Sequence, residues 1–535
     1  MMSNVTVRHA STAGLLALLA LLALLLAQAP LPWLSAALLG LGLCLMILIR
    51  PGLGLLLLAV SIPFSTVGET TVAGAAVGPT EGLLALTLAA WLAQRLAGGR
   101  LILPRPWRRR DPSALSTVDA PAAPLLLPLL LFCGALAFSL LPAISLREAV
   151  PELLKWIETL ILYLVAVDLL NESRAQKPNL QSSIFNLQSS ISNLQSRIYV
   201  GLVAALIVAG ALQAALGLYQ FVTQTGPPAF QILGRFLRAF GAFRQPNPYA
   251  GYLGMVLPLA LSLFWWAVAR LRAPRRGSPV CGRRRRLMWA ALTGGMTAVI
   301  AAGAIASWSR GAWIGIGAGA VVVTALRSRR AFGLTLTAAV LVALLFMARG
   351  GLIGGALGGR LAQIGEYLGG FDVTTVEVND DNFAVVERVA HWVAAQRMIE
   401  RTPWFGVGVG NYPIVYPQVA LPRWADPLGH AHNIYLNTWA EAGLPGLLTY
   451  LLLWLLAAWR AIRLARDRQA SAFERAVALG VLGVIVHLTI HNLFDDLFVQ
   501  RLYLHMALLL ALLSPPTSTR ARRAACLTSY PETLY

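Results

Sequence analysis

Long apolar segments recur along almost the whole chain, and they restrict its possible folds more than any other feature. Each run is about 16–24 residues long, enough to cross the hydrocarbon core of a bilayer as a helix. We place about fourteen runs, and twelve is the alternative count. They lie near 13–29, 33–49, 51–65, 80–97, 122–141, 149–170, 198–222, 249–269, 288–307, 311–326, 332–348, 436–459, 474–491 and 498–514. The pattern predicts an all-α, polytopic integral membrane protein with about 12–14 transmembrane helices.

Composition and the placement of charge agree with this fold class. Of the 535 residues, 57% are hydrophobic and 12% are charged, whereas soluble domains carry about 25% charged residues. The net charge of +20 would also suit a nucleic-acid-binding protein. Here the arginines stand in short runs between apolar segments, such as Arg108–Arg110 and Arg283–Arg286, as they do in cytoplasmic membrane loops. We therefore expect membrane lipids as partners, and no nucleic acid.

The basic runs also predict an orientation. If residues 98–120 lie in the cytoplasm, alternation places the other basic segments on the same side, as the positive-inside rule requires. These are 171–197, which contains three NLQSS-type repeats, 270–287, 327–331, 460–473 and the tail 515–535. The opposite side receives 66–79, 142–148, 223–248, 349–435 and 492–497. Both termini are then cytoplasmic. Residues 1–30 resemble a signal peptide, but we expect a retained first helix because many apolar segments follow.

This topology divides the chain into five parts. They are N-terminal helices with basic loops (1–200), a transmembrane core (201–348), an extracytoplasmic loop (349–435), C-terminal helices (436–514) and a basic tail (515–535). Loops longer than about 15 residues are usually functional or disordered, and the many aromatic residues of 349–435 argue against disorder. Within this loop, apolar spacing predicts an amphipathic helix over 383–400, and Gly406–Gly410 is expected to be irregular.

Histidines gather on the extracytoplasmic side. Six of the seven follow residue 390, and His391, His430, His432 and His491 reach this side in the predicted topology. A neutral imidazole at His432, where the loop re-enters the membrane, could take a proton from a hydroxyl, although a structural histidine at a helix start is the alternative. His430 and His432 could share a metal ion, but no neighbouring Cys or carboxylate completes a site, so we expect no metal.

A second histidine pair lies near the end of the chain. His487 and His491 are four residues apart, with Asp495 another turn along. The spacing could serve a metal or a proton relay, but a hydrogen-bonded pair within a helix is the favoured interpretation. Asp495 and Asp496 are acids at the outer surface, and they could orient an arginine or a sugar hydroxyl.

Three arginines are expected on the same outer side. Arg244 follows a Gly-Ala-Phe sequence, Arg310 lies at the mouth between two helices, and Arg388 is on the predicted loop helix. Any one of them could extend to the headgroups and pair with lipid phosphate. Several on one surface repel one another, and an anionic ligand with several oxygens would relieve that repulsion. The planar guanidinium suits phosphate in particular.

At these residues the chain resembles the O-antigen ligase/polymerase family, also called the Wzy_C-type family. Four blocks over roughly residues 200–510 carry the resemblance. They are Gly241-Ala242-Phe243 with Pro246-Asn247 and Tyr249-Ala250, then Ser309-Arg310-Gly311-Ala312, then Arg388 through Trp392 to Pro403-Trp404-Phe405-Gly406-Val407-Gly408 with Gly410 and Tyr412, and last His432-Asn433, Tyr435-Leu436 and Glu441 with Gly443-Leu444 and Gly446. No block is specific alone, and their order and spacing make the match.

The resemblance implies a metal-independent glycosyl transfer at the outer face of the inner membrane, with no cofactor. The implied donor is a glycan on a polyprenyl (undecaprenyl) diphosphate, and the acceptor is a hydroxyl of a glycan, a lipid or a protein. The essential arginines of the family correspond to Arg310 and Arg388, and its essential histidine corresponds to His432. The blocks and the polar residues near them give the candidate substrate-binding residues, which are Arg244, Asn247, His430, Asn433, Tyr435, Glu441, His491 and Asp495.

Other functions stay open at this point. The same architecture serves ligases, polymerases and protein oligosaccharyltransferases, which differ in their acceptors. A bicarbonate-type transporter is another alternative, because Lys155 and Glu158 could mark a polar path through a membrane segment. Transporters usually show internal repeats, and we find none. A non-catalytic scaffold of a glycan assembly complex is the third alternative.

Overall fold

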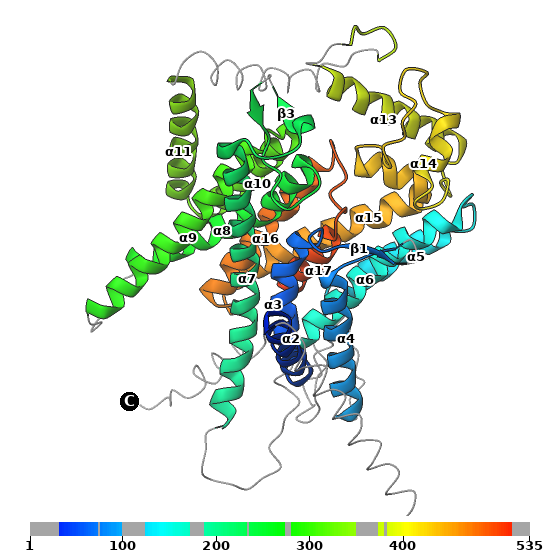
Figure 1. Ribbon diagram of the computed structural model, residues 1–535. Coiled ribbons are helices and arrows are strands. Elements are labelled where there is room, and N and C mark those ends of the chain that lie inside the picture. Colours follow the sequence, from blue (N-terminus) through cyan, green and yellow to red (C-terminus); the bar gives the residue numbers. More distant parts are fainter. Residues whose placement is uncertain are drawn as a thin grey trace, which may run out of the picture.

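A computed structural model describes residues 31–72, 75–98, 123–171, 187–232, 235–272, 280–348, 373–378 and 382–515. The apolar run at 13–29, the signal-like N-terminus, almost all of the basic stretch at 98–120 and the basic tail lie outside these described residues. The chain is an all-α membrane protein whose described helices run through a common bundle (Figure 1).

The described helices follow the apolar runs of the sequence. They are α2 (Leu31–Ile49), α3 (Pro51–Ser61), α4 (Pro79–Ala97), α5 (Leu126–Phe138), α6 (Leu146–Asn171), α7 (Leu187–Thr223), α8 (Pro246–Arg272), α9 (Val280–Ala306), α10 (Arg310–Arg327), α11 (Arg329–Ala348), α15 (Ile434–Arg466), α16 (Ala472–His491) and α17 (Leu502–Ala511). Among the described residues, five helices are long and apolar enough to cross a membrane. They are α7 to α9, α15 and α16, and shorter apolar helices accompany them. The polytopic class is confirmed, and the total of about 12–14 spans stays a prediction.

Part of one predicted loop is helical. The segment 171–197 was expected to be a cytoplasmic loop, but α7 begins at Leu187 and continues without a break to Thr223. The later NLQSS-type repeats therefore belong to a helix. Leu187, Ile191 and Leu194 recur at helical spacing, so this polar stretch can extend the apolar helix that follows it.

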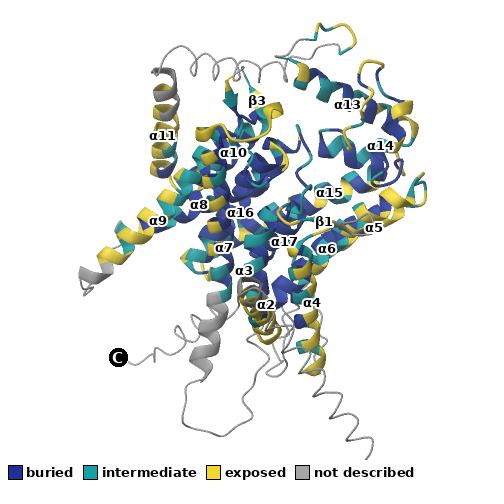
Figure 2. Cartoon of the chain, viewed as in Figure 1, coloured by how far each residue is buried: buried dark blue, intermediate teal, exposed yellow. Residues whose placement is uncertain are grey.

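The centre of the bundle depends on close helix contacts. Helix α16 packs against α8, α10 and α15. A Cβ on Gly319 of α10 would lie 2.6 Å from the carbonyl oxygen of Gly483 on α16, so only glycine permits this approach. Figure 2 shows the buried residues around α8, α16 and α17, with exposed residues on the outer sides of α9 and α11. Exposed leucines and valines on α11 suit contact with lipid.

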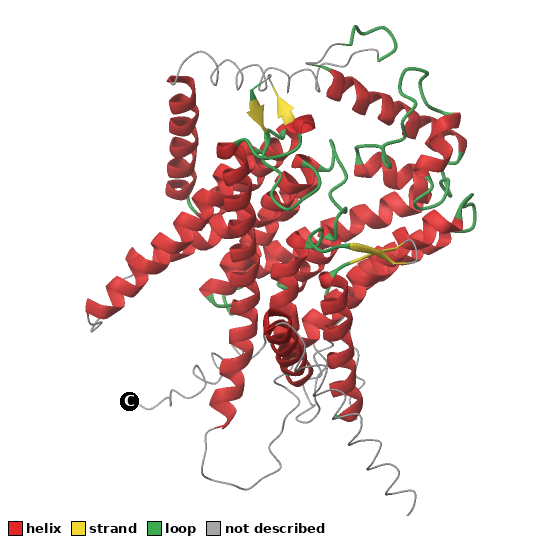
Figure 3. Cartoon of the chain, in the orientation of Figure 1, coloured by secondary structure: helices red, strands yellow, loops and turns green. Residues whose placement is uncertain are grey.

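Several elements outside the long helices gather at one end of the molecule. Helix α13 (Phe383–Arg401), the short helix α14 (Tyr412–Val415) and the hairpin of β3 (Gln231–Ile232) with β4 (Phe236–Leu237) lie there. A second hairpin pairs β1 (Thr70–Val72) with β2 (Ala75–Val77). Figure 3 shows irregular loops between α13, α14 and the near end of α10. Helix α13 confirms the amphipathic helix predicted over 383–400.

Candidate functional site

The glycine-rich segment after α13 is locked to a kink in α15. Gly443 interrupts the helical backbone at φ 65° and ψ −173°, a conformation open essentially to glycine alone. Backbone amides of Val407 and Gly408 donate to the carbonyl oxygens of Ala440 and Glu441, both at 2.9 Å. The amide of Leu444 donates to Pro403 in return, also at 2.9 Å. The third and fourth sequence blocks therefore form one interlocked unit, which fixes α13 over the start of α15.

His391 belongs to the packing between α13 and α14. Its ring stacks on Tyr416, with ring centroids 4.6 Å apart, and the Tyr412 hydroxyl lies 3.0 Å from its Nδ1 atom. Burial, with the nearby charges of His432 and His430, lowers the pKa of His391 to about 4. The side chain is thus a neutral part of a small core between α13 and α14.

His432 stands just before α15. The side chain of Asn433 caps this helix by accepting hydrogen bonds from the amides of Tyr435 and Leu436, at 3.0 and 3.1 Å. His432 itself has a left-handed backbone, with φ 52°. A hydrogen bond of 3.0 Å from the amide of Ile434 to the carbonyl oxygen of Asn492 holds this turn against the segment after α16. The strained turn at His432 therefore faces a second loop, the one that follows α16.

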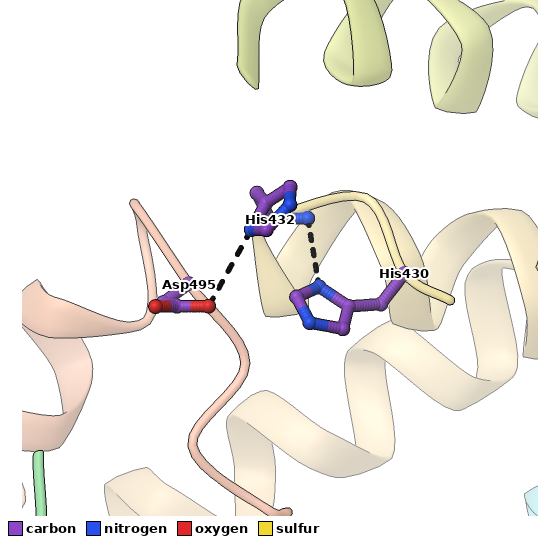
Figure 4. A group of neighbouring side chains, drawn as sticks. All are labelled: His430, His432 and Asp495. Atoms are coloured by element: carbon purple, nitrogen blue, oxygen red, sulfur yellow. Dashed lines mark hydrogen bonds and ion pairs between the residues drawn. The ribbon is translucent and has the colours of Figure 1, made fainter. Parts of the chain in front are cut away.

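That second loop brings a carboxylate to the histidines. His432 Nδ1 lies 3.5 Å from Asp495 Oδ1, and the backbone amide of His432 donates to His430 Nδ1 at 3.1 Å (Figure 4). Burial lowers the pKa of His432, and the nearby carboxylate of Asp495 opposes this shift. For Asp495, burial alone would raise the pKa, but the interaction with His432 and the positive charges around the carboxylate lower it overall. The pair is a neutral imidazole beside an ionised carboxylate, which is suited to accept a proton.

The argument against a metal site at these histidines was wrong in its premise. The sequence offered no neighbouring carboxylate, but Asp495 supplies one from some sixty residues further along the chain. One ligand atom each of His430, His432 and Asp495 lie within 4.8 Å of one another. Two imidazoles and a carboxylate are donors that Zn²⁺ accepts in open sites. The three side chains thus fit a divalent cation as well as a metal-free proton acceptor.

A polar cavity lies next to this group. Its walls carry three arginines, Arg238, Arg310 and Arg388, together with Asn247, Ser309, His491 and Asp495. Arg238 is fixed by hydrogen bonds from Nε to the carbonyl oxygen of Ser307 at 2.8 Å and from Nη2 to Asn247 Oδ1 at 2.7 Å. Arg388 donates from Nε to the carbonyl oxygen of Phe494 at 3.0 Å and from Nη1 to that of Ala384 at 2.9 Å.

Arg310 occupies the first position of α10, and its side chain is buried. The partial positive charge of this helix N-terminus adds to the charge of the three guanidinium groups. A cavity with this much positive charge suits an anion with several oxygens, such as a diphosphate.

Most of the predicted site residues lie in the arginine cavity or in the group of His430, His432 and Asp495, and a few do not. Arg244 is 66% exposed and pairs with Glu69, so Arg238 takes the place in the cavity that we expected for Arg244. Tyr435 donates from its hydroxyl to the carbonyl oxygen of Thr489 at 2.7 Å. Glu441 is buried, accepts a hydrogen bond from the amide of Tyr412 at 3.0 Å, and lines a second cavity.

Arg238 was missed by the sequence analysis. It lies in the segment 223–248 that the topology places outside the cytoplasm, six residues before Arg244, so the prediction covered its side of the membrane. The sequence does not distinguish the two, because the turn between β4 and α8 decides which guanidinium faces the cavity. His487 was expected to be part of a hydrogen-bonded pair. Its Nε2 atom lies 3.3 Å from the carbonyl oxygen of Gly251, between helices, while His491 lines the cavity.

Comparison with known families supports the resemblance. Residues 295–451 match the model of the Wzy_C family, described as O-antigen ligase. This match covers less than a third of the chain and includes Arg310, Arg388 and His432, whereas Arg238 and Asp495 lie outside it. None of the curated proteins compared with the chain matches it. The match implies an activity of the O-antigen ligase/polymerase glycosyltransferase type in a multi-pass membrane protein.

Proposed function

Because residues 295–451 match the O-antigen ligase family, we propose that this protein transfers a glycan from a polyprenyl (undecaprenyl) diphosphate to an acceptor hydroxyl. The reaction takes place at the outer face of the inner membrane, in the synthesis of a surface polysaccharide or lipopolysaccharide. One observation carries the proposal: Arg238, Arg310 and Arg388 line a single cavity that shares Asp495 with the His432 group.

The arginines suit the diphosphate of the donor. When the glycan leaves, negative charge develops on the diphosphate oxygens, and guanidinium groups already in place stabilise that charge more in the transition state than before it. Arg238 and Arg388 are held by carbonyl and amide oxygens of the protein, so little reorganisation is needed when the donor binds. This preorganised charge lets the reaction proceed without a metal ion.

His432 acts as the general base. The acceptor hydroxyl oxygen attacks the anomeric carbon of the donor while its proton passes to the imidazole. The bond from that carbon to the diphosphate oxygen breaks, and its electron pair stays on the diphosphate. The ionised carboxylate of Asp495, 3.5 Å away, stabilises the imidazolium that forms. A single direct displacement inverts the configuration at the anomeric carbon.

An O-antigen ligase-like reaction is the first choice among related activities, and polymerase or protein O-oligosaccharyltransferase activity is the alternative. The acceptor separates them. Deletion of the gene followed by analysis of the carrier lipid distinguishes two cases. Long chains that accumulate on the carrier indicate a ligase, and the loss of long chains indicates a polymerase.

The direct test is transfer in vitro by the purified full-length protein, with a polyprenyl-diphosphate glycan as donor and a chelator present. Wild type should transfer the glycan, a folded His432→Ala variant should not, and a folded Arg388→Ala variant should transfer it more slowly because its affinity for the donor is lower. Arg401→Ala removes the same charge from the exposed end of α13 and serves as the matched control. Equal transfer by wild type and His432→Ala would show that His432 is not the general base. Activity lost only in the chelator, and restored by zinc, would replace the metal-free route with a metal site at His430, His432 and Asp495.

A further inference from the structure

A second cavity lies on the other side of the loop that carries Asp495. Its walls come from α5, α6, α15, α17 and the loop after α16, and they include Glu152, Lys155, Asn437, Glu441 and Asp496. None of the residues that line it belongs to the arginine cavity. Charged side chains inside membrane helices are costly and mark functional paths or sites by default. This group therefore needs an explanation that the diphosphate site does not give.

Two adjacent residues face different cavities. Asp495 lines the arginine cavity, and Asp496, the next residue, lines the second cavity. Near the start of α15, His432 contacts Asp495 while Ile434 lines the second cavity. Side chains of consecutive residues in extended chain point to opposite sides. The two loops thus form a shared wall, and the general base stands at that wall.

The polar groups of the second cavity suit a ligand rich in hydroxyl groups. Carboxylates only accept hydrogen bonds when ionised, and Glu152 and Asp496 are available for hydroxyl donors on the ligand. Asp496 Oδ1 already accepts from the amide of Phe498 at 2.8 Å, which fixes the direction of the carboxylate. Lys155, paired with Glu152, and the amide of Asn437 supply donors. A free cation would meet the like charge of Lys155 in the same wall.

Aromatic rings pack against one another in the wall of this cavity, which argues against an open transport path. The ring of Trp156 packs edge-on against Phe132 and Phe498, with centroids 4.6 and 5.1 Å apart. Further along α6, Glu158 accepts a hydrogen bond from the Tyr503 hydroxyl at 2.8 Å. The charged residues of α6 that suggested a transporter are thus divided between a cavity wall and a hydrogen-bonded pair. Aromatic rings beside carboxylates and amides are also the surface that sugar rings pack against.

We propose that this second cavity is a sugar-binding subsite for the glycan units next to the reacting hydroxyl or the reacting anomeric carbon. The proposal rests on the proposed glycosyl transfer for its biological role, but the binding itself does not require transfer. The donor glycan and the acceptor glycan carry the same hydroxyl groups, so either could bind there. Measurements of KM for the donor and for the acceptor distinguish the two.

Binding of free sugar tests the proposal first. The probe is the oligosaccharide released by mild acid from the polyprenyl-linked glycan of the source cells, titrated into purified full-length protein in detergent. Asp496→Asn and Glu152→Gln keep the shape of each side chain and weaken its hydrogen bonds, so each should raise Kd about tenfold or more. Glu148→Gln, one turn before Glu152 on an exposed face of α6, is the matched control and should leave Kd within about twofold. No binding to wild type, or equal Kd values for all variants, overturns the subsite.

Transfer kinetics then identify the glycan that binds. A rise in KM for the acceptor alone assigns the subsite to the acceptor, and a rise in KM for the donor alone assigns it to the donor glycan. His432→Ala should abolish transfer and keep oligosaccharide binding. If wild type shows no transfer but binds the oligosaccharide in the pattern above, the proposed function fails while the subsite stands.

Discussion

Replacing Gly443 with alanine should release the interlocked unit that holds α13 over α15. A Cβ at this position would lie 2.2 Å from the carbonyl oxygen of Trp404, and the residue would have to keep φ at 65°. A non-glycine residue in such a conformation costs about 1–3 kcal/mol. The clash also pushes the 403–408 segment away and breaks the three backbone hydrogen bonds of 2.9 Å that join it to α15, at about 1 kcal/mol each. We expect Gly443→Ala to lower the free energy of unfolding by about 4–6 kcal/mol.

The assay is thermal unfolding of the purified protein in detergent, together with hydrogen exchange of the amides of Val407, Gly408 and Leu444. Gly443→Ala should melt well below wild type and lose protection at these three amides. Gly317→Ala is the matched control, because a Cβ there meets nothing within 4 Å and the residue lies in the middle of α10. It should raise stability by about 0.5–1 kcal/mol. A melting temperature of Gly443→Ala within error of wild type would refute the interlock as a source of stability.

Three further outcomes follow from the same contacts. Arg388→Ala should raise KM for the polyprenyl-diphosphate donor about tenfold or more in steady-state kinetics, because it removes a charge-assisted hydrogen bond, whereas Arg401→Ala should leave KM unchanged; equal effects would contradict the placement of the diphosphate. Burial holds the folded-state pKa of His391 at about 4, below the unfolded value of about 6.5, so protonation favours the unfolded chain and stability should fall as the pH drops from about 6.5 towards 4. Melting of His391→Gln should depend less on pH across that window, and an identical pH slope would contradict the assignment. Ser471 accepts a hydrogen bond from the amide of Glu474 at 3.1 Å in the capping box of α16, so Ser471→Ala should lose about 1 kcal/mol of unfolding free energy and Ser471→Asp should stay near wild type by thermal unfolding.

The sequence by itself determined the fold class and the helices. Apolar runs predict a membrane helix from residues that are neighbours in the chain, because a single helix satisfies its own backbone hydrogen bonds in lipid. The amphipathic helix over 383–400 was predictable for the same local reason. The sequence blocks that carry the family resemblance also contained Arg310, Arg388 and His432 before any contact between them was known.

Only the tertiary structure decided how the site is assembled. Arg238 replaces Arg244 in the cavity because a turn of a few residues orients the two guanidiniums, and local patterns do not fix such an orientation. Asp495 becomes the partner of His432 because the loop after α16 is tied to the start of α15 by one backbone hydrogen bond from Ile434 to Asn492. Hydropathy is a property of a segment, whereas a cavity is a property of several segments that pack together. The chain therefore specified its membrane helices locally and its chemistry through contacts between residues far apart in sequence.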